Sequence, residues 1–329
     1  MKVLIADYVW ANLDVERRIL ATVGAEAIVS PTGAEADLAR LATDCDAIMT
    51  CFAQVTPAVV RAATRCAHIA RYGIGVDNIA MDVATELGIA VTNVPAYCVD
   101  EVAEHALGLL LAGARKIPLY DRAIHSGRWD LQAGKPLHRI NGRTLGIVGF
   151  GKIGRALARK ASGLGLRIVA YDPYLAAQAV ETPDVELVDL DRLLRESDLV
   201  SVHVPLTAGT RAMIGEPELR KMKPSACLVN TSRGSVVDVP SLARALREGW
   251  IAAAGLDVLP EEPLPADSPL LELENLILTP HASFYSEESL VDLQTSTAEE
   301  VVRVLSGQQP LHLVNPEVLP RARAAHLRG

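Results

Sequence analysis

Three glycines in the middle of the chain are spaced as Gly-x-Gly-x-x-Gly. Gly149, Gly151 and Gly154 directly follow the apolar run Leu145–Val148, and a helical pattern of apolar residues comes after them. The first glycine permits a tight turn, the second lets the backbone approach a pyrophosphate, and the third lets helix and strand pack closely. The helix N-terminus then presents free N–H groups to phosphate. The alternative is that these glycines merely connect a strand to a helix.

A carboxylate follows at the distance that such a turn requires. Asp172 ends the next apolar run, Leu166–Tyr171, about 20 residues beyond the glycines. An acid at the tip of that strand can accept both ribose hydroxyls of an adenosine and would repel a 2′-phosphate. The whole pattern predicts a Rossmann dinucleotide site that favours NAD over NADP. Lys152 and Ile153, inside the motif, are predicted to lie along the cofactor.

Nicotinamide chemistry also needs an acid or base and a cation that holds the substrate, because the cofactor carries only the hydride. Of the eight histidines, His281 is the one that follows an apolar run, Leu276–Leu278, in a Pro-containing loop. Glu262 is the candidate carboxylate partner of its imidazole. The guanidinium of Arg233 has paired N–H donors for a carboxylate or carbonyl oxygen. Each also has a purely structural interpretation: His281 as a helix cap, Glu262 as a charge in a loop, and Arg233 as a residue that forms an ion pair.

Short apolar runs alternate with helical patterns, which predicts βαβ units and parallel sheets. Before residue 100, strands are predicted at Val3–Ala6, Ala47–Thr50, His68–Arg71 and Ile89–Val91, with helices at Asp14–Val23, Pro57–Ala63 and Ile79–Leu87. After the glycine motif, strands are predicted at Leu199–Val204, Ala226–Val229, Ala252–Leu256 and Leu276–Leu278. Their carboxyl ends are where ligands gather in such sheets. The expected fold class is α/β with two doubly wound parallel sheets.

Three further segments suggest how the domains are connected. A helix at Asp100–Ile117 is predicted to leave the first domain, and the polar stretch Pro118–Asn141 is predicted to be a surface or interface arm. A last helix, Glu287–Leu305, and a Pro-broken tail are expected to return to the first domain. The predicted domains are a discontinuous, flavodoxin-like substrate-binding domain at 1–99 and 285–329 and an inserted Rossmann NAD-binding domain at 100–284.

Composition limits the classes of function. A net charge of −8 without a Lys/Arg cluster argues against a nucleic-acid partner. The most apolar run, Ala106–Ala114, is too short to cross a membrane, and no signal peptide pattern precedes Val3. Five scattered cysteines without a C-x-x-C pattern predict reduced thiols, and hence a cytoplasmic protein.

The chain resembles the NAD-dependent D-isomer-specific 2-hydroxyacid dehydrogenase family over essentially its whole length. The resemblance is carried, in the family's order, by the segments Arg71–Asn78, Gly149–Arg155, Asn230–Asp238, Asp257–Pro263 and Thr279–Ser283. Within the family, His203 and the sequences around Tyr174 and Phe284 are similar to the branch that contains the C-terminal-binding proteins. The resemblance implies hydride transfer between NAD(H) and a small 2-hydroxy or 2-oxo acid, performed by a homodimer.

The resemblance also implies roles for individual residues. Arg233, Glu262 and His281 would be the catalytic set, and Asp257 would bind the nicotinamide carboxamide. The cofactor would further contact His203, Val204, Pro205, Thr231, Ser232, Arg233 and His281. The substrate would be held by Arg71, Ile74, Gly75, Val76, Arg233 and His281, and no metal is expected. From the residues alone, the Gly73–Gly75 segment predicts a backbone nest for a carboxylate, or a tight turn capped by Asp77.

Two alternatives stay open at this point. The C-terminal-binding resemblance permits an NAD(H)-sensing binding protein with little turnover, although Phe284 stands where that branch has Trp. A phosphoglycerate- or phosphite-type dehydrogenase is the other alternative. Glu262 argues against formate dehydrogenase activity, because enzymes of that type have Gln as the partner.

Overall fold

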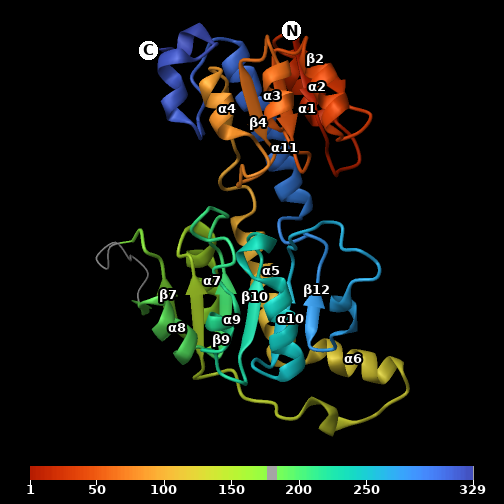
Figure 1. Cartoon of the computed structure of the whole chain (residues 1–329), viewed down its shortest axis with the longest axis vertical. Helices are drawn as coiled ribbons and strands as arrows, with labels where there is room; N and C mark the ends of the chain where they lie inside the picture. The colour runs from red at the N-terminus through yellow and green to blue at the C-terminus, as the bar shows by residue number, and fades with distance from the viewer. Residues whose placement is uncertain (176–183, 329) are drawn as a thin grey trace. The chain divides into compact units, whose positions relative to one another are not determined.

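The computed structural model describes residues 1–175 and 184–328, which form two compact units. One unit comprises Met1–Tyr97 with Ser286–Gly329, and the other comprises Cys98–Tyr285. Each contains one parallel sheet with helices on both faces (Figure 1), so the predicted fold class is confirmed. We call them the terminal unit and the central unit.

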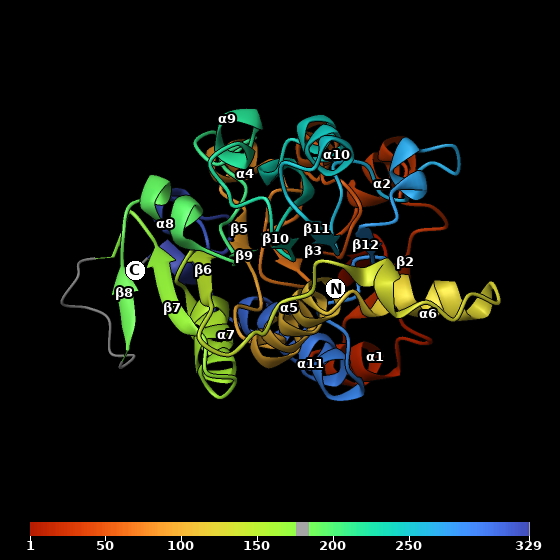
Figure 2. The same cartoon turned by 90° about the horizontal axis from the view of Figure 1, so that it is seen from below.

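The terminal unit is built on a five-stranded parallel sheet in the order β2-β1-β3-β4-β5, which is the flavodoxin-like order. Its strands are β1 (Lys2–Ile5), β2 (Glu26–Val29), β3 (Ala47–Thr50), β4 (His68–Arg71) and β5 (Ala90–Thr92). Its helices are α1 (Asp14–Ala21), α2 (Glu35–Ala42), α3 (Pro57–Ala62), α4 (Met81–Glu86) and α11 (Glu287–Leu305). Helices α2, α3 and α4 share one apolar cluster with the sheet, whereas α1 and α11 lie side by side (Figure 2).

The C-terminal segment belongs to the terminal unit although it is distant in sequence. Helix α11 has the predicted bounds and is capped at its N-terminus by Ser286, whose side chain accepts a hydrogen bond from the Ser289 backbone N–H. Beyond the helix, Asn315 Oδ1 accepts from the Val91 N–H at 2.8 Å and Asn315 Nδ2 donates to the Ile89 carbonyl at 3.0 Å. These two bonds attach the tail to strand β5.

The central unit is built on a seven-stranded parallel sheet in the order β12-β11-β10-β9-β6-β7-β8. Its strands are β6 (Thr144–Val148), β7 (Arg167–Tyr171), β8 (Val185–Leu187), β9 (Leu199–Val202), β10 (Cys227–Asn230), β11 (Ala253–Leu256) and β12 (Leu276–Leu278). Its helices are α5 (Val99–Ala114), α6 (Ile117–His125), α7 (Lys152–Ser162), α8 (Leu190–Glu196), α9 (Glu216–Leu219) and α10 (Val239–Glu248). Helices α5 and α7 pack together on one face, and α8, α9 and α10 cover the other (Figure 2).

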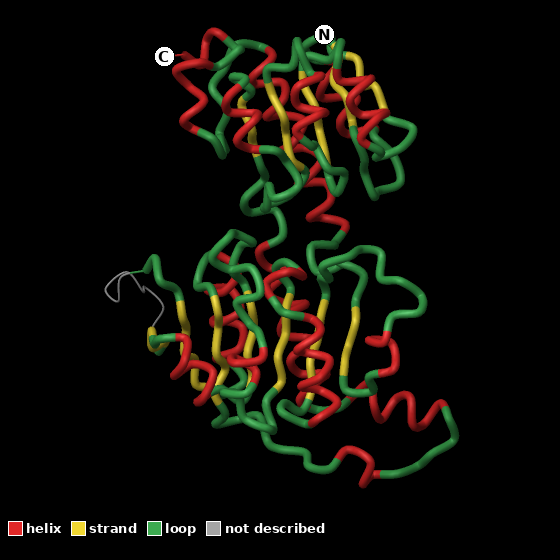
Figure 3. Tube along the Cα trace, viewed as in Figure 1, coloured by secondary structure: helices red, strands yellow, loops and turns green. Residues whose placement is uncertain are grey.

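The segment after α5 differs from the sequence prediction. The predicted helix Asp100–Ile117 ends at Ala114, because Lys116 adopts a left-handed conformation with φ of 54° that stops it. A second helix, α6, then begins at Ile117 with Pro118 in its first turn, where a proline is tolerated. Residues 126–143 are mostly loop, with one short 3-10 turn (Figure 3). The predicted surface or interface arm therefore begins with a helix that was not predicted.

Within the described part of the chain, no helix is long and apolar enough to cross a bilayer. The five cysteines are all free thiols and all are buried. Among the same described residues, no group of three or more His, Cys, Asp or Glu side chains is placed to hold a metal ion.

Candidate active site

The glycine turn lies at the carboxyl end of β6. Gly149 has φ of 93°, and a Cβ built on it would lie 2.8 Å from the carbonyl carbon of His203. A Cβ on Gly154 would lie 2.4 Å from the Gly149 oxygen, whereas a Cβ on Gly151 would have no neighbour within 4 Å. Gly149 and Gly154 are therefore needed for packing, and Gly151 borders open space at the N-terminus of α7. Such space beside a helix N-terminus fits a pyrophosphate.

Asp172 stands beside this turn, at the tip of β7. Its Oδ2 accepts from the Phe150 N–H at 3.0 Å and its Oδ1 accepts from the Tyr174 N–H at 3.0 Å. The carboxylate is thus fixed next to the glycines and keeps lone pairs for further donors. Lys152 and Ile153 form the first turn of α7, with Lys152 exposed and Ile153 half-buried.

The loops after β9 and β10 contain buried polar atoms that lack a protein partner. His203 is bonded through Nε2 to Ser201 Oγ at 2.8 Å, but its Nδ1 has no partner, and burial lowers its pKa to about 4. The buried Oγ1 of Thr231 also has none. Val204 and Pro205 follow His203, and Ser232 donates twice to Asn230 Oδ1. Unpartnered groups of this kind fit a polar ligand that supplies the missing bonds.

Arg233 is positioned by close contact between two backbones. The Asn230 side chain donates to the Arg233 carbonyl at 2.9 Å, and Arg233 Nη1 donates to the Ser232 carbonyl at 2.8 Å. A Cβ on the next residue, Gly234, would lie 2.0 Å from the carbonyl carbon of Leu259. The loop after β10 therefore touches the loop after β11, and only a glycine permits this approach.

The loop after β11 carries Glu262, which meets His281 from the loop after β12. His281 Nδ1 and Glu262 Oε2 are 2.8 Å apart, and Glu262 Oε1 accepts from the Leu259 N–H at 2.8 Å. Burial alone would raise the pKa of Glu262, but the hydrogen bond and charge of His281 outweigh it and lower that pKa. The Phe284 ring packs edge-on against the imidazole, with centroids 6.1 Å apart.

Asp257 organises the loop that carries His281. Its buried carboxylate accepts from Thr279 Oγ1 at 2.6 Å, from the Ala282 N–H at 2.8 Å and from the Ser283 N–H at 2.9 Å. Burial raises the pKa of Asp257, but these donors outweigh it and the net shift is downward. His281 itself has φ of 53° and donates from its backbone N–H to the Asp257 carbonyl at 2.8 Å. This role was not predicted from the sequence, because none of these contacts is visible in a local pattern.

In the terminal unit, the predicted carboxylate-binding segment follows β4. Arg71 is only 8% exposed, and its guanidinium lies over Gly73 and donates to the Tyr72 carbonyl at 2.5 Å. Its Nε has no partner. Asn93 Nδ2 donates to the Ile74 carbonyl at 2.6 Å, which fixes the turn that continues through Gly75 and Val76. A buried guanidinium with an unused donor suits an anionic ligand.

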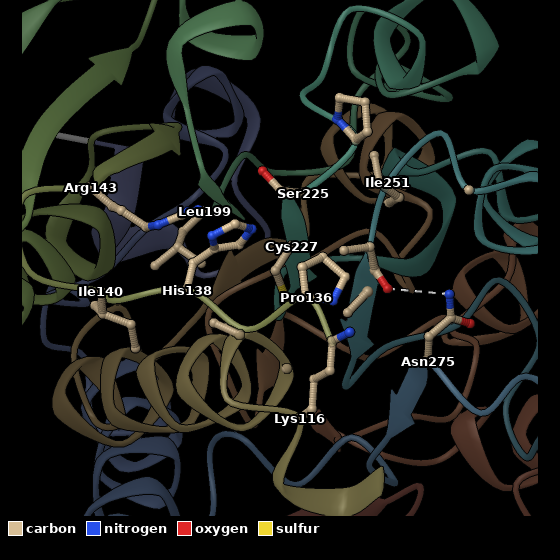
Figure 4. Close-up of a pocket in the computed structure, with 16 residues that line it drawn as sticks. Lys116, Pro136, His138, Ile140, Arg143, Leu199, Ser225, Cys227, Ile251 and Asn275 are labelled. Atoms are coloured by element: carbon tan, nitrogen blue, oxygen red, sulfur yellow. Dashed lines mark hydrogen bonds between the residues drawn. The ribbon is translucent and has the colours of Figure 1, made fainter. Parts of the chain in front are cut away.

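The central unit brings most of the predicted residues to one edge of its sheet. Following the strand order from β12 to β7, the carboxyl ends carry His281, Asp257 with Glu262, Arg233, His203, the glycine turn and Asp172. A pocket of about 370 Å³ lies elsewhere, where β9, β10 and β11 begin, and is lined by Leu199, Cys227 and Ala253 among others (Figure 4). It contains none of the predicted site residues, so it is not the candidate active site.

The chain is similar to known proteins in sequence and in fold. Residues 107–283 match the family described as D-isomer specific 2-hydroxyacid dehydrogenase, NAD binding domain. A glyoxylate reductase of Korarchaeum cryptofilum is 46% identical over 281 residues, 84% of each chain. The structure of a glyoxylate reductase from Paecilomyes thermophila has a TM-score of 0.86 at 30% identity, covering 95% of this chain and 98% of that one. A D-lactate dehydrogenase from Aquifex aeolicus, complexed with NAD and lactic acid, has a TM-score of 0.83 at 27% identity, covering 93% and 96%.

Proposed function

Since the chain belongs to the D-isomer specific 2-hydroxyacid dehydrogenase family and is an NAD-dependent oxidoreductase of 2-hydroxy or 2-oxo acids, we propose that it reduces glyoxylate or a similarly small 2-oxo acid. The observation that carries the proposal is the His281–Glu262 pair, 2.8 Å apart, beside the loop of Arg233. Two relatives named glyoxylate reductase support the choice of substrate.

The proposal assigns the NAD-binding role to the central unit and the substrate-binding role to the terminal unit. NAD would be held by the glycine turn, by Asp172 through its ribose, and by the unpartnered polar atoms of His203 and Thr231. Arg71 and the backbone N–H groups of Ile74–Val76 would bind the substrate carboxylate with Arg233. The remaining predicted cofactor contacts are Lys152, Ile153, Val204, Pro205, Ser232 and Asp257.

In the reducing direction, bound NADH supplies a hydride to C2 of the 2-oxo acid. The Nδ1–H of His281 donates to Glu262, which leaves Nε2 to give a proton to the forming alkoxide oxygen. The lowered pKa of Glu262 keeps its carboxylate charged, so that it remains the acceptor of the Nδ1–H. Arg233 would fix the substrate so that proton and hydride reach neighbouring atoms.

The test is NADH oxidation with glyoxylate, hydroxypyruvate, pyruvate and a branched 2-oxo acid, for the wild type and two variants. His281→Ala should lower kcat at least about 100-fold, because general acid catalysis contributes about 10²–10⁴-fold. Glu262→Gln should lower kcat less than His281→Ala does, since a neutral amide oxygen still accepts the Nδ1–H but through a weaker hydrogen bond. His326→Ala is the matched control, because His326 is exposed in the C-terminal tail of the terminal unit.

Three outcomes would contradict the proposal. Wild-type turnover in His281→Ala would exclude the histidine as the acid. Tight NADH binding without oxidation by any of these acids would favour an NAD(H)-sensing protein of C-terminal-binding type. NAD reduction by 3-phosphoglycerate or phosphite in the same assay would favour those donors instead.

We also propose that the protein is a cytoplasmic homodimer that associates through the arm at 117–141. Large apolar side chains are exposed along this segment, with Trp129 89% and Leu131 78% exposed. A second copy would remove them from water. Light scattering should give twice the chain mass for the wild type and the single mass for a Trp129→Ser/Leu131→Ser variant. The free, buried cysteines support a reducing compartment.

A further inference from the structure

A histidine of helix α5 contacts the loop that carries the proposed catalytic acid. His105 Nε2 lies 3.0 Å from Thr279 Oγ1 and 3.5 Å from Asp257 Oδ1. The His105 side chain is 26% exposed, whereas that of Asp257 is fully buried. The contact joins residues 174 positions apart.

The direction of these hydrogen bonds follows from the number of protons available. The downward shift in the pKa of Asp257 keeps it ionised, so its carboxylate can only accept, and Thr279 Oγ1 must donate its single proton to it. Toward His105 the same hydroxyl can then only accept. His105 Nε2 therefore carries a proton and donates to Thr279, whatever the state of its Nδ1.

The relay His105–Thr279–Asp257 ends on the backbone of the catalytic loop. Asp257 accepts from the N–H groups of Ala282 and Ser283, which directly follow His281. The His281 N–H also donates to the carbonyls of Asp257 and Thr279, at 2.8 and 3.0 Å. With φ of 53°, His281 occupies a left-handed conformation that needs such support.

We propose that His105 is a positioning residue, which holds Thr279 on Asp257 and thereby keeps the His281 imidazole aligned with Glu262. Without the His105 donor, the Thr279 hydroxyl is free to rotate away from Asp257. The carboxylate then loses its shortest bond, and the loop loses part of the support for its strained residue. This inference rests on the proposed role of His281 as the acid.

The test compares His105→Phe, which keeps a ring but has no donor, with His105→Gln, whose amide N–H reaches about as far as Nε2. Glu104→Gln is the matched control, because Glu104 lies on the same helix and pairs with Lys160 instead. His105→Phe should lower kcat about five- to tenfold, as expected for one lost hydrogen bond in the transition state. The KM for the 2-oxo acid should change less than about twofold, and His105→Gln should restore kcat.

Substitutions of Thr279 distinguish the loss of this chain of hydrogen bonds from a general loss of stability. Thr279→Val should lose at least as much kcat as His105→Phe, and the double variant should lose no more than Thr279→Val alone, because both act through one chain of bonds. Thr279→Ser should retain activity. Additive losses, or a loss in His105→Gln equal to that in His105→Phe, would overturn the proposal.

A third measurement does not depend on turnover. Amide hydrogen exchange of the segment 279–284 should accelerate in His105→Phe and stay at the wild-type rate in His105→Gln and Glu104→Gln. Unchanged exchange in His105→Phe would overturn the relay. Faster exchange in a protein whose wild type oxidises no NADH would instead support the relay and refute the proposed function, so the two failures are distinguishable.

Discussion

The two sheets have the same switch point and use it in opposite ways. In each, the first strand lies between the second strand and a later one: β1 lies between β2 and β3, and β6 lies between β7 and β9. At the end of β1, the Asp7 carboxylate accepts from the Cys51 and Phe52 N–H groups at 2.8 and 2.6 Å. At the end of β6, the glycine turn stands instead, with space around Gly151.

The difference shows that sheet topology creates a possible ligand site at the switch point but does not determine whether a ligand binds there. In the terminal unit an internal anion already uses the backbone donors at the switch point, so a phosphate would meet a negative charge there. In the central unit the Asp172 carboxylate takes one N–H group of the turn, that of Phe150, and Gly151 at the start of α7 borders open space that a ligand can enter. The residues after the first strand therefore decide which sheet binds the cofactor.

The largest effect is expected from replacing Gly149, and Gly151 provides the contrast. Gly149→Ala should lower the free energy of unfolding by about 2–5 kcal/mol, because it adds a left-handed alanine and a clash with His203. Gly151→Ala should change it by less than about 1 kcal/mol, but raise the Kd for NADH more than about tenfold. Urea unfolding and NADH fluorescence titration measure the two quantities. Equal effects of both variants on stability would refute the distinction.

A smaller effect is expected at the other switch point. Asp7→Ala should lower the free energy of unfolding by about 1–3 kcal/mol, since it leaves the Cys51 and Phe52 N–H groups without their acceptor. The Kd for NADH should stay at the wild-type value. Urea unfolding and exchange of the segment 50–53 test the first expectation. Weaker NADH binding would contradict the view that this switch point has no part in cofactor binding.

The effect that is smallest at neutral pH concerns acid stability, because each unit contains a histidine whose pKa is lowered by burial: His68 in the terminal unit and the half-buried His203 in the central unit. Burial lowers the pKa of His68 to about 3 and that of His203 to about 4, from 6.5. Below pH 6.5 the unfolded chain binds these protons and the folded chain does not. Stability should therefore fall by about 1.4 kcal/mol per pH unit for each histidine, down to the folded pKa.

Substitution of each histidine separates the two units. His68→Gln should make the free energy of unfolding fall less steeply between about pH 6 and pH 4, because the variant lacks the one proton that His68 binds on unfolding. The Kd for NADH should not change. His203→Gln should have a similar effect on the free energy of unfolding and also weaken NADH binding, because His203 follows β9 at the proposed site. Urea unfolding at several pH values checks both. An acid stability curve unchanged in His68→Gln would show that the residue is not neutral in the fold.

The sequence predicted those parts of the fold whose signals are local. Strands β3, β4 and β12 and helix α11 have the predicted bounds, because each combines a clear period with flanking turn or cap residues. Strand β2 and helix α6 were missed, since the first is a half-exposed edge strand of four residues and the second follows a break that only the conformation of Lys116 reveals.

The candidate site divides in the same way. The glycine motif and Asp172 could be predicted from spacing alone. For Arg233, Glu262 and His281 the spacing was only suggestive, and their roles were implied by the family resemblance. The contacts of Asp257 and His105 with Thr279 join residues far apart in sequence, and no periodicity announces them. Residues that act through tertiary contacts can therefore be identified only from a structure.

The contact at Gly234 has a consequence for protein engineering. Gly234 has no side chain, so the backbones of the loops after β10 and β11 are in contact. The loop after β11 therefore cannot be exchanged independently of the loop after β10. A chimaera that imports residues 257–283 from a relative should keep its activity only where the recipient retains glycine at 234. The Arg71–Val76 turn, which we propose binds the substrate, belongs to the other unit and is not subject to this constraint.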